Sequence, residues 1–201
     1  MQQKPTKGQY IEVLLRSPKT VFSTKDVALL WGEDKEKTIS GRLGKYARAG
    51  KLVRVRRGFY AKDKNYDRFE LATRIYTPSY VSFETVLTRA GLNFQYYETI
   101  FVASYINREL VADGQKIKFV RMKDYVLSSG VGIEHAGGYA IANKERAFLD
   151  RIYISKDYHF DYLDVLDWDK VFEILPLYHN QRMDKKVAEY FADYKNNQTR
   201  V

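Results

Sequence analysis

The segment "LVRVRRGFYAKD", residues 52–63, has the pattern of a short β-hairpin with three arginines in it. Successive side chains of a strand point to opposite faces, so the alternation in "VRVRR" predicts valines turned toward a core and arginines turned away from it. Gly58 gives the backbone the freedom that a tight turn needs, and Phe59 and Tyr60 begin the return strand. We therefore expect a rigid hairpin that presents Arg54, Arg56 and Arg57 outward.

Three short helices are expected before this hairpin. "GQYIEVLLR" (8–16) places its apolar residues on one helical stripe. Ser23 and Asp26 have the spacing of a capping box at the start of "TKDVALLW" (24–31), and a third helix covers about residues 35–49. The order helix, short helix, helix and basic hairpin predicts a winged helix-turn-helix.

The third helix separates its apolar residues from its polar ones. Ile39, Leu43 and Tyr46 recur at helical spacing, and the opposite face collects basic residues and two glycines. In a winged helix-turn-helix this helix enters the major groove and the hairpin meets the neighbouring backbone or a minor groove. The candidate DNA-binding residues are therefore Lys37, Ser40, Gly41, Arg42, Lys45 and Arg48 of the helix and Arg54, Arg56 and Arg57 of the hairpin.

Gly41 and Gly44 are unusual inside a helix, where each glycine costs about 1 kcal/mol relative to alanine. One explanation is that they let the helix backbone approach a ligand closely. The other is that they allow close packing between helices. The sequence leaves both explanations open.

The net charge of +9 is confined to the first third of the chain. Residues 1–67 hold 16 Lys and Arg against 7 Asp and Glu, whereas residues 68–201 hold 18 of each kind. A basic module joined to a neutral one is typical of a polyanion-binding domain with a separate partner domain. We therefore expect a DNA-binding domain at 1–67 and a second domain at 68–201. Chance clustering of solvated charge and a winged helix used for protein contacts are the alternatives.

The second part is expected to be mixed α+β, which makes the whole chain an α+β protein. Its first two helices are "RFELATRIY" (68–76) and a helix that starts at an N-cap, Ser82, and runs through about Ala90. Further strands are expected at 99–105, 115–123 and 137–143, and further helices at 144–154, 167–178 and 181–196.

No pattern in the chain indicates catalysis. The absence of cysteine excludes disulfides and thiolate chemistry, and three scattered histidines show no metal-ligand spacing. A run of aspartates could be imagined as a metal site, but it lacks the glycine and terminal glutamate of a calcium loop, so a solvated, helix-capping segment is favoured. Its members are Asp157, Asp161, Asp164, Asp167 and Asp169. We expect no enzymatic activity and no cofactor.

The sequence also has no run of about 20 apolar residues, and its first ten residues, "MQQKPTKGQY", contain no apolar stretch. A membrane protein and a secreted protein are therefore not expected. A cytoplasmic location fits this pattern and the lack of cysteine.

Four segments resemble a known family in the correct order. "KLVRVRRGFYA" (51–61) resembles the wing of the AbiEi antitoxins, which belong to type IV toxin–antitoxin systems of abortive infection. The other similar segments are "YVSFETVLTRAGL" (80–92), "GGYAIANKERAFLDRIY" (137–153) and "WDKVFEILPLY" (168–178).

The resemblance implies a transcriptional repressor that binds inverted repeats in the promoter of its own operon. It further implies a C-terminal domain that counteracts a nucleotidyltransferase-like toxin without forming a stable complex with it. Two other classes of function stay open beside this one. They are a protein-interaction or scaffold module, and an enzyme such as a nuclease that uses the acidic cluster.

Overall fold

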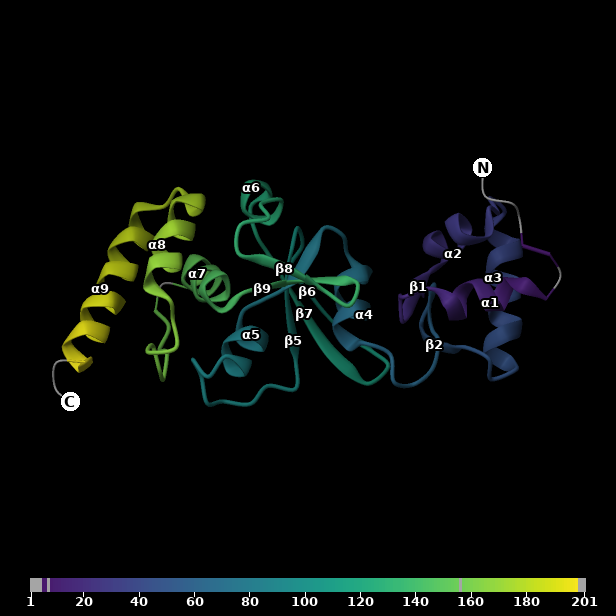
Figure 1. Ribbon diagram of the computed structural model, residues 1–201, viewed down its shortest axis with the longest axis horizontal. Coiled ribbons are helices and arrows are strands. Elements are labelled where there is room, and N and C mark those ends of the chain that lie inside the picture. The colour runs from purple at the N-terminus through teal and green to yellow at the C-terminus, as the bar shows by residue number, and fades with distance from the viewer. Residues whose placement is uncertain (1–4, 7, 156, 199–201) are drawn as a thin grey trace.

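The computed structural model describes residues 5–6, 8–155 and 157–198. These residues form a mixed α+β structure with two β-sheets, as expected. Figure 1 shows an elongated molecule, with the first helices at one end, the larger sheet in the middle and the last helices at the other end. None of the helices within the described ranges is long and apolar enough to cross a lipid bilayer.

The N-terminal unit contains three helices and a three-stranded antiparallel sheet of order β1-β3-β2. Its elements are α1 (Gln9–Arg16), β1 (Val21–Ser23), α2 (Thr24–Trp31), α3 (Glu36–Arg48), β2 (Val53–Arg56) and β3 (Phe59–Ala61). The expected helices and hairpin are confirmed to within a residue or two. So is the capping box, because the Ser23 hydroxyl accepts from the Asp26 N–H and the Asp26 carboxylate accepts from the Ser23 N–H.

A small core holds this unit together. Ile39 and Leu43, the expected apolar stripe of α3, are buried against residues of α1, α2 and the hairpin. Trp31 is fully buried and its indole N–H donates to the Tyr10 carbonyl at 2.9 Å. The other buried members are Leu14, Phe22, Val27, Leu52 and Tyr60.

The rest of the chain is built on a six-stranded sheet of order β6-β7-β5-β4-β9-β8. The strands are β4 (Ser79–Val81), β5 (Ile100–Ser104), β6 (Arg108–Ala112), β7 (Gln115–Arg121), β8 (Ile133–Ala136) and β9 (Tyr139–Ala142). The strands expected around 99–105, 115–123 and 137–143 are confirmed as β5, β7 and β9. The β5–β7 and β4–β9 pairs are parallel and the other pairs are antiparallel.

Helices cover both faces of this sheet (Figure 1). On one face lies α4 (Arg68–Ile75), and on the other lie α5 (Glu84–Arg89) and α7 (Lys144–Ile154). The remaining elements are α6 (Asp124–Leu127), α8 (Trp168–Ile174), the 3₁₀ turn η1 (Leu175–Tyr178) and α9 (Gln181–Gln198). Successive residues of β5 point to opposite faces of the sheet. Val102 packs in the apolar core on the α4 side, and Ala103 packs in the apolar core on the side of α5 and α7.

The expectation that Ser82 caps a helix is wrong. A strand, β4, occupies the positions just before it, and the residue at the start of α5 is Phe83, with a φ of 54°. Ser82 is instead buried, and its hydroxyl donates to the Asp150 carboxylate at 2.7 Å. Ser82 does not cap a helix because the residues before it pair with β5 and its hydroxyl is hydrogen-bonded to the distant, buried Asp150 carboxylate.

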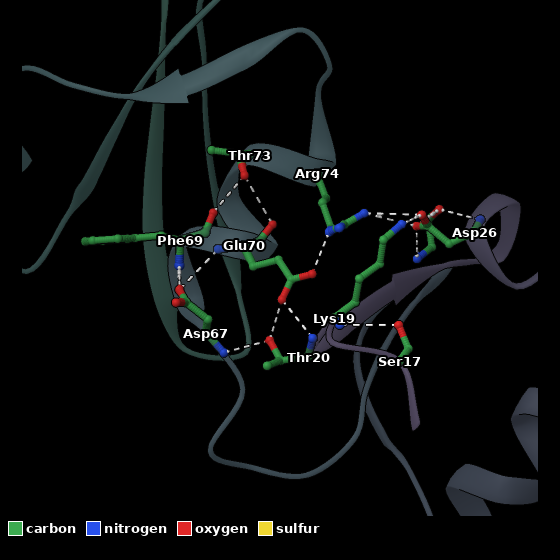
Figure 2. A network of polar contacts seen from close by, with 10 residues as sticks. Ser17, Lys19, Thr20, Asp26, Asp67, Phe69, Glu70, Thr73 and Arg74 are labelled. Atoms are coloured by element: carbon green, nitrogen blue, oxygen red, sulfur yellow. Dashed lines mark hydrogen bonds and ion pairs between the residues drawn. The ribbon is translucent and has the colours of Figure 1, made fainter. Parts of the chain in front are cut away.

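A polar network joins the N-terminal unit to α4 (Figure 2). Glu70 is fully buried, and its carboxylate accepts from the N–H and the hydroxyl of Thr20. Arg74 bridges the two parts, since it contacts Glu70 at 2.9 Å and Asp26 at 3.2 Å. Lys19 also pairs with Asp26, at 2.6 Å.

An apolar cluster lies beside this network and crosses the expected boundary at residue 67. Val21, Val55 and Ala61 of the small sheet share it with Leu71 of α4 and Phe119 of the large sheet. The division into 1–67 and 68–201 stays a prediction about folding units. In the folded chain the two parts are in direct contact.

Candidate nucleic-acid interface

One face of α3 is open to solvent along its length. Lys37, Ser40, Gly41, Lys45 and Arg48 are all exposed, and Gly44 beside them is half-buried. A helix turns every 3.6 residues, which brings these positions to one side while Ile39 and Leu43 hold the other side in the core. The structure thus brings together all the predicted residues of this helix except Arg42.

The glycines of α3 do not serve packing within the chain. Apart from its own helix, a Cβ placed on Gly41 or on Gly44 would meet no atom of the described residues within 4 Å. Neither glycine has a positive φ, so neither is required by the backbone conformation. Within the described residues, nothing supports close packing between helices as the explanation for these two glycines.

Arg42 lies on the flank of α3 and turns toward α1. Its guanidinium carbon stands 3.6 Å from the centre of the Tyr10 ring and 5.4 Å from that of Trp31. One of its terminal nitrogens, Nη1, is buried and has no hydrogen-bond partner in the described part of the chain. Sequence spacing placed Arg42 at the edge of the face but gave no sign of this stacking, which depends on how α1 crosses α3.

The hairpin exposes two of its three arginines. Arg54 and Arg57 are exposed, whereas Arg56 is half-buried with a buried, unpartnered Nη1. Val55 is buried as expected, and Gly58 at the turn has a φ of 81°. The pairing register of β2 with β3 is irregular between Arg54 and Arg56, so the two arginines do not occupy equivalent positions opposite β3.

The basic side chains of this surface have no acidic partners in the part of the chain that the structure describes. No ion pair with a carboxylate is formed within the described ranges by any of six residues, namely Lys37, Lys45, Arg48, Arg54, Arg56 and Arg57. By contrast, Lys19 and Arg74 belong to the polar network between the N-terminal unit and α4, and they are paired with half-buried and buried carboxylates. We call the open face of α3 together with Arg54 and Arg57 the basic face.

Neither a family model nor a curated protein matches the sequence.

The aspartates of the acidic segment do not converge. Across the described residues, no group of three or more His, Cys, Asp or Glu side chains is arranged to hold a metal ion. Asp167 caps α8 by accepting from the Lys170 N–H, and Asp161 accepts from the Phe94 N–H at 2.8 Å. The interpretation of this segment as helix-capping is therefore confirmed for Asp167.

Sequence reasoning missed a buried ion pair, Arg146 with Asp150, 3.2 Å apart in α7. Both side chains are fully buried, and Tyr80 and Tyr178 donate to the same carboxylate oxygen at 3.2 and 2.7 Å. Burial raises the pKa of Asp150, although the nearby Arg146 charge and the donated hydrogen bonds act in the opposite direction.

The polar groups around this pair are satisfied inside the protein, since Arg146 also donates to the carbonyls of Val126 and Val131. Without access to solvent the pair is suited to fixing α7 against the sheet rather than to binding a ligand. Arg146 and Asp150 lie four residues apart and flank the apolar run Ala147, Phe148 and Leu149, and this spacing was the signal that could have found the pair.

Proposed function

We propose that this protein is a transcriptional repressor that binds double-stranded DNA through a winged helix-turn-helix. In this proposal α3 lies in the major groove, and the β2–β3 hairpin is the wing that contacts the adjacent backbone. The observation that carries the proposal is the basic face, where cations without an ion pair and two glycines with open space beside them lie together among the described residues.

The residues of α3 have different roles within this proposal. Lys37, Lys45 and Arg48 are suited to phosphate contacts, and Ser40 is the polar side chain of α3 placed to reach base edges. Gly41 and Gly44 allow the helix backbone to approach the DNA. Arg42, stacked on Tyr10, supports the orientation of α3 against α1.

The antitoxin part of the proposal rests on the resemblance to the AbiEi family. We propose that the protein represses its own operon at an inverted repeat and counteracts a nucleotidyltransferase-like toxin, without catalysis of its own. The part beyond residue 67 would carry the second activity. An adjacent gene for a nucleotidyltransferase-like protein would support this reading, and an unrelated neighbour would speak against it.

A protein-docking role for the same unit is the second candidate. Leu29 of α2 is 80% exposed and would be an apolar contact of such a docking surface. Leu29→Ser leaves the basic face intact. A DNA-binding protein should therefore tolerate it, whereas a docking module should lose its partner.

The deciding experiment measures fluorescence anisotropy of two labelled duplexes, one from the promoter of the protein's own operon and one of scrambled sequence. We expect tighter binding to the promoter duplex and a loss on both duplexes for Lys45→Ala/Arg48→Ala. The control is Lys116→Ala/Lys118→Ala, which removes the same charge from β7. Equal effects of the two double variants, or no duplex binding at about 150 mM salt, would exclude the basic face as a DNA-binding surface.

A further inference from the structure

A hollow of about 370 Å³ lies between α4, α5 and the loop that precedes β5. Small-molecule sites commonly have volumes of about 300–1,000 Å³, so one small ligand fits here. The hollow is lined by residues from Asp67 to Tyr139 and shares none with the basic face.

Aromatic rings form much of its wall. Phe69 of α4 and Tyr139 of β9 meet edge to face, with 5.5 Å between ring centres. Tyr96 and Tyr97 of the loop also line the hollow, and Tyr96 is 82% exposed. Rings arranged in this way offer faces and edges against which a flat ring can stack.

Two arginines also line the hollow. Arg89 stands 4.4 Å above the Phe69 ring and Arg68 stands 5.9 Å from the Tyr66 ring, and neither forms an ion pair in the described part of the chain. Three carboxylates line the same hollow. Glu98 is exposed on the loop, and Asp67 and Glu84 have other partners. Asp67 accepts from the N–H groups of Phe69 and Glu70, and Glu84 pairs with Arg151 at 3.1 Å.

The loop that closes the hollow is fixed by the protein. The Thr88 hydroxyl donates to the Gln95 carbonyl at 3.1 Å, and the Phe94 N–H donates to Asp161 at 2.8 Å. The Gln115 side chain donates to the Glu98 carbonyl. A ligand would therefore meet a wall that is already ordered, which lowers the entropic cost of binding.

We propose that this hollow binds a small planar aromatic anion of the nucleoside monophosphate class. The ring lies against the aromatic wall, and the anionic group lies at Arg68 and Arg89. This site is independent of the proposed DNA-binding function, because its residues belong to α4, α5, β9 and the loop before β5.

The test is isothermal titration calorimetry of the full chain with three probes: AMP, adenosine and inorganic phosphate. We expect saturable binding of AMP with a Kd of about 1 mM or tighter, and at least about 10-fold weaker binding of each part alone. Arg68→Gln/Arg89→Gln should weaken AMP binding by about 10-fold or more, because it removes the charge-assisted contacts.

Two control variants test whether the AMP binding measured by calorimetry takes place at this hollow. Arg121→Gln removes an exposed arginine at the end of β7 and should leave AMP binding unchanged. Lys45→Ala/Arg48→Ala removes charge from the basic face and should also leave it unchanged. Circular dichroism melting establishes that each variant is folded.

Several outcomes would overturn the proposal. They are no saturable AMP binding up to about 10 mM, equal affinity for phosphate or for adenosine alone, and AMP binding that survives Arg68→Gln/Arg89→Gln in a folded protein. Loss of AMP binding in the basic-face variant would assign the nucleotide to the DNA-binding surface instead.

Discussion

The carboxylate of Glu70 accepts two hydrogen bonds from Thr20, one from its N–H at 2.8 Å and one from its hydroxyl at 2.6 Å. The two residues are fifty positions apart, and Glu70 is fully buried. Through this pair the first turn of α4 is tied to the residue that precedes β1 (Figure 2). The N-terminal unit is therefore held to the larger sheet by a charged group that water does not reach.

Glu70→Ala should lower the free energy of unfolding by about 3 kcal/mol. It leaves the Thr20 donors and the Arg74 guanidinium without their buried acceptor, and removing one partner of a buried charged pair is strongly destabilising. Urea denaturation followed by circular dichroism measures the change. The control is Glu173→Ala, an exposed helical glutamate of α8, for which we expect less than about 0.5 kcal/mol. A similarly small effect of Glu70→Ala would mean that the contact between Glu70 and Thr20 contributes little to the stability of the protein.

Gly41→Ala and Gly44→Ala should each stabilise the protein by about 0.5–1 kcal/mol and yet weaken its binding to DNA. Alanine favours the helix, and the added methyl group meets nothing in the chain, but it stands on the face that we propose approaches DNA. Thermal melting and duplex anisotropy measure the two effects. Stabilised variants with unchanged affinity would show that α3 does not approach DNA closely.

Gly50→Ala is the matched control for those two variants. A Cβ at Gly50 would also meet open space, but its φ is 69°, a conformation that costs an alanine about 1–2 kcal/mol. The same substitution should therefore destabilise the protein at Gly50 and stabilise it at Gly41.

Ser40→Ala and Arg42→Ala should have different consequences. Ser40 is exposed on α3, so its loss should weaken promoter binding by about 1–3 kcal/mol and leave scrambled DNA unaffected. Arg42 is stacked on Tyr10, so its loss should lower stability by about 0.5–2 kcal/mol. Anisotropy on both duplexes and urea denaturation separate the two. An unchanged stability for Arg42→Ala would show that the stacking is incidental.

Replacing Arg54, Arg56 and Arg57 by alanine should flatten the dependence of log K on log salt by about 2 units per bound monomer, because Arg54 and Arg57 belong to the basic face and Arg56 is half-buried. Each phosphate contact releases condensed counterions with a slope of about −0.9. The matched control replaces Lys116, Lys118 and Arg121 of β7, which removes the same charge. If the wing variant keeps the wild-type slope, the hairpin does not touch DNA, and a protein-contact role takes its place.

Asp26→Asn should lower stability at pH 7 by about 1–2 kcal/mol, with a smaller effect in acid. Burial alone would raise the pKa of Asp26, but hydrogen bonds from Lys19 and Ser23 and the Arg74 charge lower it below 3.8. A lowered folded-state pKa stabilises the protein above pH 3.8, and this stabilisation is lost as the pH falls through the folded value. Urea denaturation at pH 7 and at about pH 3 measures the difference. A difference in unfolding free energy between wild type and Asp26→Asn that is larger at low pH than at pH 7 would contradict a lowered pKa for Asp26.

The sequence by itself determined the elements whose signals are local. The capping box at Ser23 and Asp26 marks the start of α2 within a few residues of chain. The stripe of Ile39 and Leu43 identifies α3, and the "VRVRRG" pattern identifies the hairpin. The excess positive charge of the first third and the mixed α+β class also follow from composition and periodicity alone.

Only the tertiary structure decided the features that depend on distant partners. Strands β1 and β4 are three residues long, too short for a periodic signal, and they exist because they pair with β3 and with β5 and β9. The stacking of Arg42 on Tyr10 and the open space beside Gly41 depend on how helices cross. The buried carboxylate of Glu70 looks in sequence like an ordinary helical glutamate. It becomes the acceptor for Thr20 only because folding removes water from the carboxylate and brings two residues fifty positions apart into contact.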